Sequence, residues 1–302
     1  MIKRKFGWTD VEVPIIGQGT WLIDDNGGGG NHHHNNNNHK IAIKTLQLGL
    51  DLGMTHIDTA EMYGNGRAEE LVGEAISGRR DEVFLVSKVL PSNASYERTI
   101  KSCRQSLKRL KTDWLDLYLL HWPSGTHHIS ETMNAMEKLV ADGMVRYIGV
   151  SNFGVVELKE AEMALRNERI ACNQVLHHLG YRGIEKSILP YCAKQGIAVV
   201  GYSPFGHNGS LYSSSSQSKG GRLQHLEEIA KRHGKTPRQV VLNFLTSVHP
   251  TATNVFTIPK TSNPDHAREN SESVGWDLAE DEIASINEAF PLPDHDGPLE
   301  MI

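Results

Sequence analysis

The segment GMTHIDTAEMYGNG, residues 53–66, is the most informative stretch of the chain. A short strand-like run in it ends on Asp58, and Tyr63 follows in the same loop. The next two strand-like runs along the chain end on Lys88 and His121. Four chemically active side chains therefore stand at or just after the ends of successive strand-like runs.

Strand-like and helix-like patterns alternate along nearly the whole chain. Short apolar runs without alternation are typical of parallel strands buried on both faces. They cover residues 15–19, 55–58, 83–88, 115–121, 146–150, 171–175, 198–202 and 254–258. Apolar residues at three- and four-residue intervals predict helices between them. These cover residues 41–52, 68–77, 96–110, 129–141, 155–166, 184–195 and 237–248, with additional helices at 222–233 and 281–289. Eight strands alternating with helices predict an α/β fold, the (β/α)8 TIM barrel.

Three further features belong to this fold prediction. A polar hairpin is expected at residues 5–13, before the first barrel strand. Gly53, Gly143 and Gly196 stand where helices are expected to end. A single domain covering residues 1–302 is the simplest organisation for a chain of this length.

Two segments interrupt the alternation. Residues 27–39 are rich in Gly, Asn and His and contain no apolar residue, so we expect a solvated or disordered loop insert. Its histidines, His32, His33, His34 and His39, are expected to bind no metal, because a flexible tract offers no fixed surroundings for one. Residues 206–221, rich in Ser and Gly, are expected to form a mobile flap.

Composition excludes several classes of function. The chain has a net charge of -5 and 38% hydrophobic residues, so no broad basic surface suggests nucleic acid or an anionic membrane. Three isolated cysteines without metal-ligand spacing suit a reducing compartment. No apolar run follows the basic N-terminus, so neither a signal peptide nor a membrane span is expected, and the cytoplasm is the default location.

The four side chains at the strand ends suit the reduction of a carbonyl. A buried Lys lowers the pKa of a neighbouring Tyr, an Asp keeps the Lys charged, and a His orients the carbonyl group. Each residue alone has a more ordinary explanation: a turn Asp, a solvated Lys or a packed His. Their joint occurrence favours catalysis, because the chemistry of such barrels takes place at the C-terminal ends of the strands.

Residues 53–66 closely resemble the first signature of the aldo-keto reductase family, and the resemblance extends over nearly the whole chain. It implies catalytic roles for Asp58, Tyr63, Lys88 and His121. It also implies a nicotinamide site in which Ser151, Asn152 and Gln174 bind the carboxamide and Tyr202 stacks on the ring. The residues that the resemblance assigns to the inner part of the cofactor site are Gly19, Thr20, Trp21, Asp58, Ser151, Asn152, Gln174, Tyr202, Ser203 and Pro204.

The outer part of the cofactor site follows the last predicted strand. The resemblance assigns Lys260 and Thr261 to the cofactor phosphate, at the start of a helix expected near Pro264. It assigns Arg268, Glu269 and Asn270 to the adenosine end. Many family members have an Arg where this chain has His266, so we expect NADPH to be preferred by a modest factor, with NADH also possible.

The expected partner is a small-molecule carbonyl substrate. The resemblance and their aromatic character assign the substrate pocket to Trp21, His121, Trp122 and Phe153. The protein is expected to be a monomer or a weak homo-oligomer. One rival function is a slow, cofactor-binding subunit of a larger assembly. Another is a metal-dependent hydrolase using His56, His121, His177 and His178, although a His-x-His pair at one strand end is lacking.

Overall fold

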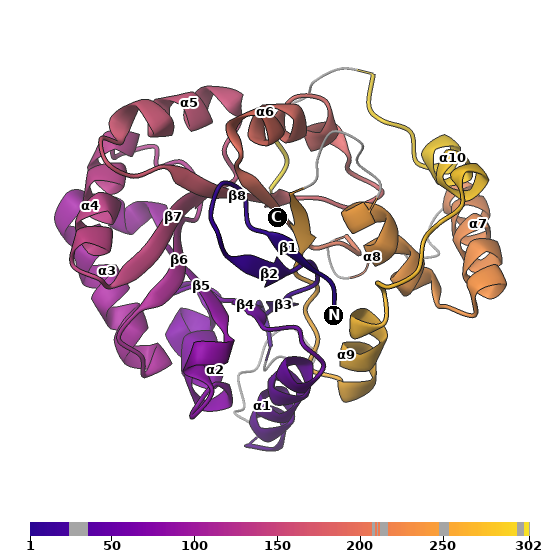
Figure 1. Ribbon diagram of the computed structural model, residues 1–302, viewed down its shortest axis with the longest axis horizontal. Coiled ribbons are helices and arrows are strands. Elements are labelled where there is room, and N and C mark those ends of the chain that lie inside the picture. Colours follow the sequence, from indigo (N-terminus) through magenta and orange to yellow (C-terminus); the bar gives the residue numbers. More distant parts are fainter. Residues whose placement is uncertain are drawn as a thin grey trace.

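Eight parallel strands form one sheet in the order of the chain. The computed structural model describes residues 1–23, 36–206, 209, 211, 217–247, 254–294 and 299–301. The strands are β3 (Gln18–Gly19), β4 (His56–Asp58), β5 (Phe84–Val89), β6 (Leu115–Leu120), β7 (Val145–Ser151), β8 (Ile170–Leu176), β9 (Ala198–Tyr202) and β10 (Val255–Thr257). Parallel bridges from Ile16 to Thr257 and from Gly19 to Lys260 join the first strand region to the last, so the sheet closes on itself. The predicted (β/α)8 barrel is confirmed (Figure 1).

A ring of helices surrounds the strands (Figure 1). It consists of α1 (Asn36–Asp51), α2 (Arg67–Ala75), α3 (Tyr96–Leu110), α4 (Ile129–Ala141), α5 (Val155–Ala164), α6 (Ile188–Gln195), α8 (Pro237–Ser247) and α9 (Pro264–Ser271). Short 3₁₀ turns are η1 (Tyr63–Gly66), η2 (Arg80–Glu82), η3 (Pro91–Asn93) and η4 (Gly183–Glu185). One helix prediction was wrong in detail, because η4 and α6 divide the segment expected to be one helix. Gly53, Gly143 and Gly196 all have positive φ, as expected where helices end.

Side chains in the central parts of β5 and β6 alternate between the interior and the helical layer. In β6, Leu117 and Leu119 belong to the core inside the barrel, whereas Tyr118 and Leu120 belong to the core between strands and helices. The same alternation in β5 turns Ser87 toward α2 and Lys88 into the barrel, as their hydrogen-bond partners show. Both strands are fully buried, which explains their continuous apolar pattern.

The predicted N-terminal hairpin closes one end of the barrel. It consists of β1 (Lys3–Lys5) and β2 (Glu12–Pro14), paired antiparallel. Phe6 follows β1 and is fully buried, with its ring centroid 4.9 Å from that of Phe84 and 5.0 Å from that of Phe256. Because Phe84 begins β5, the hairpin covers the end where the strands start. Figure 1 shows it lying across the centre of the ring.

The glycine-rich insert is only partly described, and its last residues differ from the prediction. Residues 27–35, with His32, His33 and His34, lie outside the described residues. Helix α1 begins at Asn36 rather than at residue 41, so the last four insert residues are helical. His39 explains part of this order, because its ring nitrogens lie 2.6 Å from Arg67 and 3.2 Å from Glu74 of α2. The expectation of a loop up to His39 was therefore wrong.

Two further helices pack beside the ring. Helices α7 (Gln217–His233) and α10 (Glu280–Ala289) contact each other and lie together at the right of Figure 1. Helix α7 begins at Gln217, so the C-terminal part of the expected flap is helical, while most of residues 207–216 lies outside the described residues. Among the described residues, no helix is both long enough and apolar enough to cross a membrane.

Candidate active site

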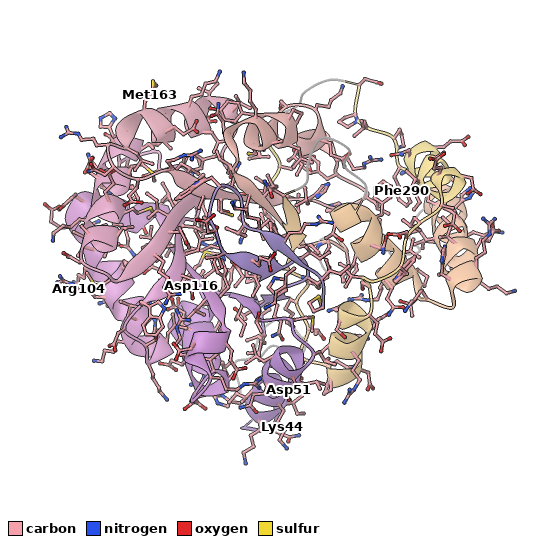
Figure 2. All side chains as sticks on the ribbon, viewed as in Figure 1. Lys44, Asp51, Arg104, Asp116, Met163 and Phe290 are labelled. Atoms are coloured by element: carbon pink, nitrogen blue, oxygen red, sulfur yellow. The ribbon has the colours of Figure 1, made fainter. Side chains whose placement is uncertain are left out.

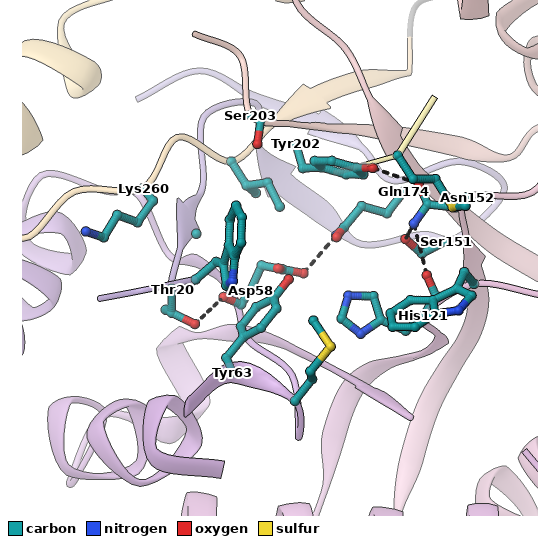
Figure 3. A pocket seen from close by; sticks show the side chains of 16 residues that line it. Thr20, Asp58, Tyr63, His121, Ser151, Asn152, Gln174, Tyr202, Ser203 and Lys260 are labelled. Carbon is teal, nitrogen blue, oxygen red and sulfur yellow. Dashed lines mark hydrogen bonds between the residues drawn. The ribbon is translucent and has the colours of Figure 1, made fainter. Parts of the chain in front are cut away.

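Asp58, Tyr63 and His121 meet inside the open end of the barrel (Figure 3), and Lys88 is hydrogen-bonded to Asp58 and Tyr63. Asp58 is the last residue of β4, and Lys88 is the penultimate residue of β5. Tyr63 begins the η1 turn, and His121 directly follows β6. Because neighbouring parallel strands end side by side, residues distant in sequence are brought together here.

The ammonium group of Lys88 has three hydrogen-bond partners. Its Nζ lies 2.6 Å from Asp58 Oδ1, 2.8 Å from the carbonyl oxygen of Thr59 and 3.2 Å from Tyr63 Oη. An ammonium group has three protons, so this set uses all of them. Since the Tyr63 oxygen accepts from Lys88, the phenolic proton remains available for donation to another acceptor.

The pKa values of this pair depend on burial as well as on charge. Burial disfavours the charged form of Lys88, but the nearby Asp58 and Tyr63 outweigh burial and raise the pKa of Lys88. For Tyr63, burial is the largest influence and raises the pKa, although the charge of Lys88 acts in the opposite direction. The expectation that Lys88 leaves the phenol with a lowered pKa is therefore corrected: the phenol is kept in its protonated form.

His121 is neutral under all ordinary conditions. Burial, followed by the charge of Lys88, lowers the pKa of His121 to about 2. Its ring centroid lies 5.6 Å from that of Tyr63, in an edge-on arrangement. The carbonyl oxygen of His121 accepts a hydrogen bond from Asn152 Nδ2 at 3.0 Å, which fixes the backbone at this point. A neutral imidazole in this position has one N–H group to donate.

Amide side chains from β8 and from the end of β7 tie the site together. Gln174 Nε2 donates to Asp58 Oδ2 at 2.8 Å, so each carboxylate oxygen of Asp58 accepts a bond. Tyr202 Oη donates to Asn152 Oδ1 at 2.8 Å, and Asn152 Nδ2 also lies 3.2 Å from Ser151 Oγ. The direct bond from Gln174 to Asp58 was not predicted from sequence, because it joins residues 116 positions apart.

Two non-glycine residues at these strand ends have left-handed backbone conformations. Asn152 has a φ of 59° and Ser203 has a φ of 51°. Such conformations cost free energy for side chains other than Gly and occur preferentially at functional sites. Both residues line the cavity described next.

A cavity of about 310 Å³ opens in front of these groups. Its walls carry most of the residues that the sequence assigned to the site. They are Gly19, Thr20, Trp21, Asp58, Met62, Tyr63, His121, Trp122, Ser151, Asn152, Gln174, Tyr202, Ser203, Ile258, Lys260 and Met301. Met301 was missed, because nothing in the sequence of the C-terminal tail indicates that it reaches the opposite end of the barrel from the hairpin.

Several predicted site residues do not line this cavity. Phe153 is fully buried in the core between strands and helices, so its assignment to the substrate pocket is corrected. Pro204 is also buried, and Thr261 hydroxyl accepts a bond from the Asn263 backbone at 2.9 Å. Lys88 does not line the cavity either, because it is fully buried and bonds to Asp58 and Tyr63, which do line it. Helix α9 carries three more such residues, Arg268, Glu269 and Asn270.

The surroundings of the three α9 residues differ. Arg268 is exposed. Glu269 Oε1 accepts from the Thr236 hydroxyl at 2.5 Å. Asn270 is buried, and its amide oxygen has no partner among the described residues. A buried acceptor without a partner is rare and is consistent with a ligand contact.

The arrangement combines three chemical capacities in one enclosed space. Tyr63 has a protonated phenol with a free proton, His121 is a neutral donor, and Lys88 is a buried cation stabilised by Asp58. Such groups are suited to stabilising and protonating an oxygen atom on which negative charge develops. Within the described residues, no group of three or more side chains could bind a metal ion.

Comparison with known proteins gives one family. The model of the aldo/keto reductase family matches residues 15–290. Similar chains include a methylglyoxal reductase of Escherichia coli strain K12, 40% identical over 97% of this chain and 96% of the relative. A glyoxal reductase of Bacillus subtilis strain 168 is 35% identical over 92% of this chain and 89% of the relative.

The fold has equally clear counterparts among solved structures. The crystal structure of an aldo-keto reductase from Klebsiella pneumoniae in complex with NADPH is 37% identical, with a TM-score of 0.87. The similarity covers 100% of both chains.

Proposed function

Because the chain belongs to the aldo/keto reductase family, we propose that it reduces small aldehydes and 2-oxoaldehydes to alcohols, with NADPH as the hydride source and Tyr63 as the proton donor. One observation carries this proposal. The Tyr63 oxygen accepts a hydrogen bond from the fully buried Lys88, while the Tyr63 side chain faces the cavity beside His121. A phenol so placed donates its proton into the cavity.

Tyr63 and Lys88 act together on the proton. As the carbonyl oxygen gains negative charge, the phenol of Tyr63 transfers its proton to it and becomes a phenolate. The ammonium group of Lys88, 3.2 Å from the phenolic oxygen, stabilises that phenolate electrostatically. Asp58 keeps Lys88 charged and oriented through a 2.6 Å contact that is buried from water. Gln174 fixes the other carboxylate oxygen of Asp58.

His121 polarises the carbonyl rather than protonating it. A group with a pKa of about 2 is not an imidazolium at neutral pH, so it has no proton to transfer. Its remaining N–H group donates a hydrogen bond to the carbonyl oxygen and positions it near Tyr63. The hydrogen bond from Asn152 to the His121 backbone keeps the ring in place for this contact.

The residues of the open end fit a nicotinamide cofactor. The cavity presents a tyrosine ring, two amides and a hydroxyl for a flat, polar ring, and Lys260 lies at its edge for a phosphate group. The buried acceptor of Asn270 suits the amino group of a purine. Ser151, Asn152, Gln174 and Tyr202 would bind the nicotinamide end. When bound, the cofactor supplies a hydride, which the protein side chains cannot provide.

The lining of the cavity favours small, uncharged substrates. Trp21, Met62, Trp122 and Met301 form apolar walls around the polar groups. No arginine lines the cavity within the part of the chain that the structure describes. A carboxylate substrate would therefore lack the bidentate hydrogen bonds that an arginine provides. The names of two relatives, a methylglyoxal reductase and a glyoxal reductase, fit this substrate class.

A slow cofactor-binding subunit is the alternative. The same barrel and cofactor site would serve it, so the distinguishing property is turnover. A complete set of Asp58, Tyr63, Lys88 and His121 in hydrogen-bonding or ring contact favours the enzyme. The metal-dependent hydrolase has no such support, because His56 packs against Phe6 and Phe84 rather than lining the cavity.

The test is to remove one hydroxyl group and measure two properties. Tyr63→Phe should reduce methylglyoxal about 10³-fold more slowly than the wild type, since general acid catalysis contributes about 10²–10⁴. Fluorescence titration should show NADPH affinity within about twofold of the wild type, because the phenol is not a principal cofactor contact.

Tyr118→Phe is the matched control. Tyr118 is fully buried, and its hydroxyl has no partner among the described residues. Turnover should be unchanged in that variant. Wild-type turnover in Tyr63→Phe would refute the assignment of the proton donor, and negligible NADPH consumption by the wild type with every aldehyde tested would favour the slow subunit.

A further inference from the structure

The turn that carries Tyr63 has an unusual backbone. Tyr63 is followed by three residues with positive φ: Gly64 at 57°, Asn65 at 54° and Gly66 at 89°. Helix α2 begins at the next residue, without a side-chain cap. The two glycines adopt this conformation without steric cost, but Asn65 adopts it only where its surroundings determine it. The position of the Tyr63 hydroxyl therefore depends on whatever fixes this turn and the start of α2.

Arg109, from the last turn of α3, lies directly against the turn. A Cβ atom added to Gly66 would stand 2.5 Å from Arg109 Cδ and 2.6 Å from its Nε. The absence of a side chain at Gly66 thus lets the arginine side chain pass beneath the turn. Farther along α2, a Cβ atom on Gly73 would stand 2.7 Å from the carbonyl oxygen of Leu110, so α2 and the end of α3 are closely packed there as well.

Glu69 connects this arginine to the strand that carries Lys88. Arg109 Nε donates to Glu69 Oε2 at 2.5 Å, and the Ser87 hydroxyl donates to Glu69 Oε1 at 2.5 Å. Glu69 is fully buried between the strands and the helices. It belongs to the first turn of α2, where a negative charge is favoured. A buried carboxylate is costly unless it is paired, so this site keeps a charge where a simple apolar residue would pack.

We propose that Glu69 and Arg109 are positioning residues for the reduction: they fix the left-handed turn of Tyr63 against α3 and couple it, through Ser87, to the strand bearing Lys88. Neither residue lines the cavity, so neither touches the substrate. The chain of contacts runs from α3 through α2 to β5. On the helix side of the strand, these contacts connect the turn that carries Tyr63 to the strand that carries Lys88. Inside the barrel, the side chains of Tyr63 and Lys88 contact each other directly. The proposal rests on the proposed function of Tyr63 as the proton donor.

The test uses Glu69→Gln, which keeps a similar shape and removes the charge. Arg109 is partly exposed, with 23% of its side-chain surface accessible, so it can be hydrated when its partner is neutral. Single-turnover reduction of methylglyoxal should slow by about tenfold, because a misplaced group can cost up to about 10²-fold. The solvent deuterium isotope effect should increase, since proton donation from Tyr63 becomes slower, while NADPH affinity stays unchanged.

Asp116→Asn is the matched control for the loss of a buried ion pair. Asp116 is buried at the second position of β6 and contacts Arg80 at 2.8 Å and Arg146 at 3.0 Å. Figure 2 places it inside the ring of helices, whereas Met163 and Lys44 lie at the outer edge. This variant should lose thermal stability and keep the wild-type isotope effect. If Glu69→Gln also keeps the wild-type rate and isotope effect, the positioning role is refuted.

A second pair of variants covers the case in which Glu69→Gln does not fold. Gly66→Ala introduces a methyl group against Arg109, whereas Gly78→Ala, at a φ of 76°, meets nothing within 4 Å. Both introduce backbone strain, but only Gly66→Ala should raise the isotope effect. Equal effects in the two would overturn the proposal. If Tyr63→Phe keeps wild-type turnover, the proposed function fails; if Tyr63→Phe is inactive and Gly66→Ala is normal, only the positioning role fails.

Discussion

Two histidines at opposite ends of the barrel have nearly the same electrostatic properties and different surroundings. His56 begins β4 and His121 follows β6. Burial, with a smaller contribution from Lys88, lowers the pKa of His56 to about 3 and that of His121 to about 2. His56 packs edge-on against Phe84, with ring centroids 5.6 Å apart, whereas His121 lines the cavity beside Tyr63.

The difference shows that a shifted pKa does not by itself mark a functional residue. Both rings have a buried nitrogen without a partner among the described residues. At the closed end, both ring nitrogens of His56 are buried in this way, and the ring packs edge-on against Phe6 and Phe84. At the open end, His121 Nδ1 is also buried, but the ring lines the cavity and lies edge-on to Tyr63. We therefore expect position at the C-terminal ends of the strands to decide which histidine takes part in chemistry.

The largest loss of turnover should come from removing the positive charge of Lys88 at the open end. Lys88→Met should lower turnover by about 10³-fold, because the phenolate of Tyr63 loses its electrostatic partner. Asp58→Asn should show a milder form of the same defect, since Lys88 keeps its contacts with Thr59 and Tyr63. Turnover at neutral pH and thermal unfolding, measured on both variants, check this. Full activity in both would make the pair structural.

At the closed end, replacing a large buried side chain by alanine should lower stability and leave turnover unchanged. Phe6→Ala should lower the free energy of unfolding by about 3–5 kcal/mol, as expected for a fully buried aromatic side chain. Turnover per folded molecule should stay unchanged. Ile2→Ala, at an exposed position before the hairpin, is the control and should change stability by less than about 0.5 kcal/mol. Chemical denaturation measures the free energy of unfolding, and initial rates at denaturant concentrations below the unfolding transition measure the turnover of the folded protein. A fall in turnover for folded Phe6→Ala would weaken the contrast between the two ends.

The two histidines allow a matched substitution. His121→Leu should lower turnover by about 10²-fold, because the carbonyl loses a hydrogen-bond donor in the transition state. His56→Leu should leave turnover within about twofold, because its ring only packs among apolar neighbours. Steady-state kinetics on both variants decide the point. Similar losses in the two would contradict the assignment of chemistry to the open end.

The smallest expected effect is on the preference for NADPH over NADH. Lys260 offers one cation to the 2′-phosphate, while His266 is exposed on α9. We expect a preference for NADPH over NADH of about tenfold, rising in His266→Arg, which adds a charge-assisted hydrogen bond. Dissociation constants for both cofactors, measured in the wild type and the variant, test this. Equal affinity for NADPH and NADH in the wild type would remove the phosphate role of Lys260.

Much of the fold was predictable because it depends on local pattern and on one geometric rule. Continuous apolar runs marked the buried parallel strands, and the rule that such strands end at one face brought Asp58, Lys88 and His121 together. Tyr63 followed from its place in the loop after β4. Local periodicity was enough at each step, since no knowledge of distant contacts was required.

The parts that failed depend on contacts between distant segments. Helix α1 begins early, at Asn36, and His39 near its start contacts α2. Phe153 is an aromatic residue near a strand end, and only packing shows that it is in the core. Met301 reaches the cavity through the path of the C-terminal tail. The net direction of the Tyr63 pKa required the degree of burial, which the sequence does not contain.

The most direct test of the central claim is the pH dependence of reduction in single turnovers, which identifies the group that donates the proton. A donor is active below its own pKa, and the pKa of Tyr63 is raised above the usual value of 10.0. The rate should therefore remain constant through neutral pH and fall only above pH 10.0. A rate that instead falls with a midpoint near the ordinary histidine pKa of about 6.5 would contradict the account, because it would make an imidazolium the donor in place of Tyr63.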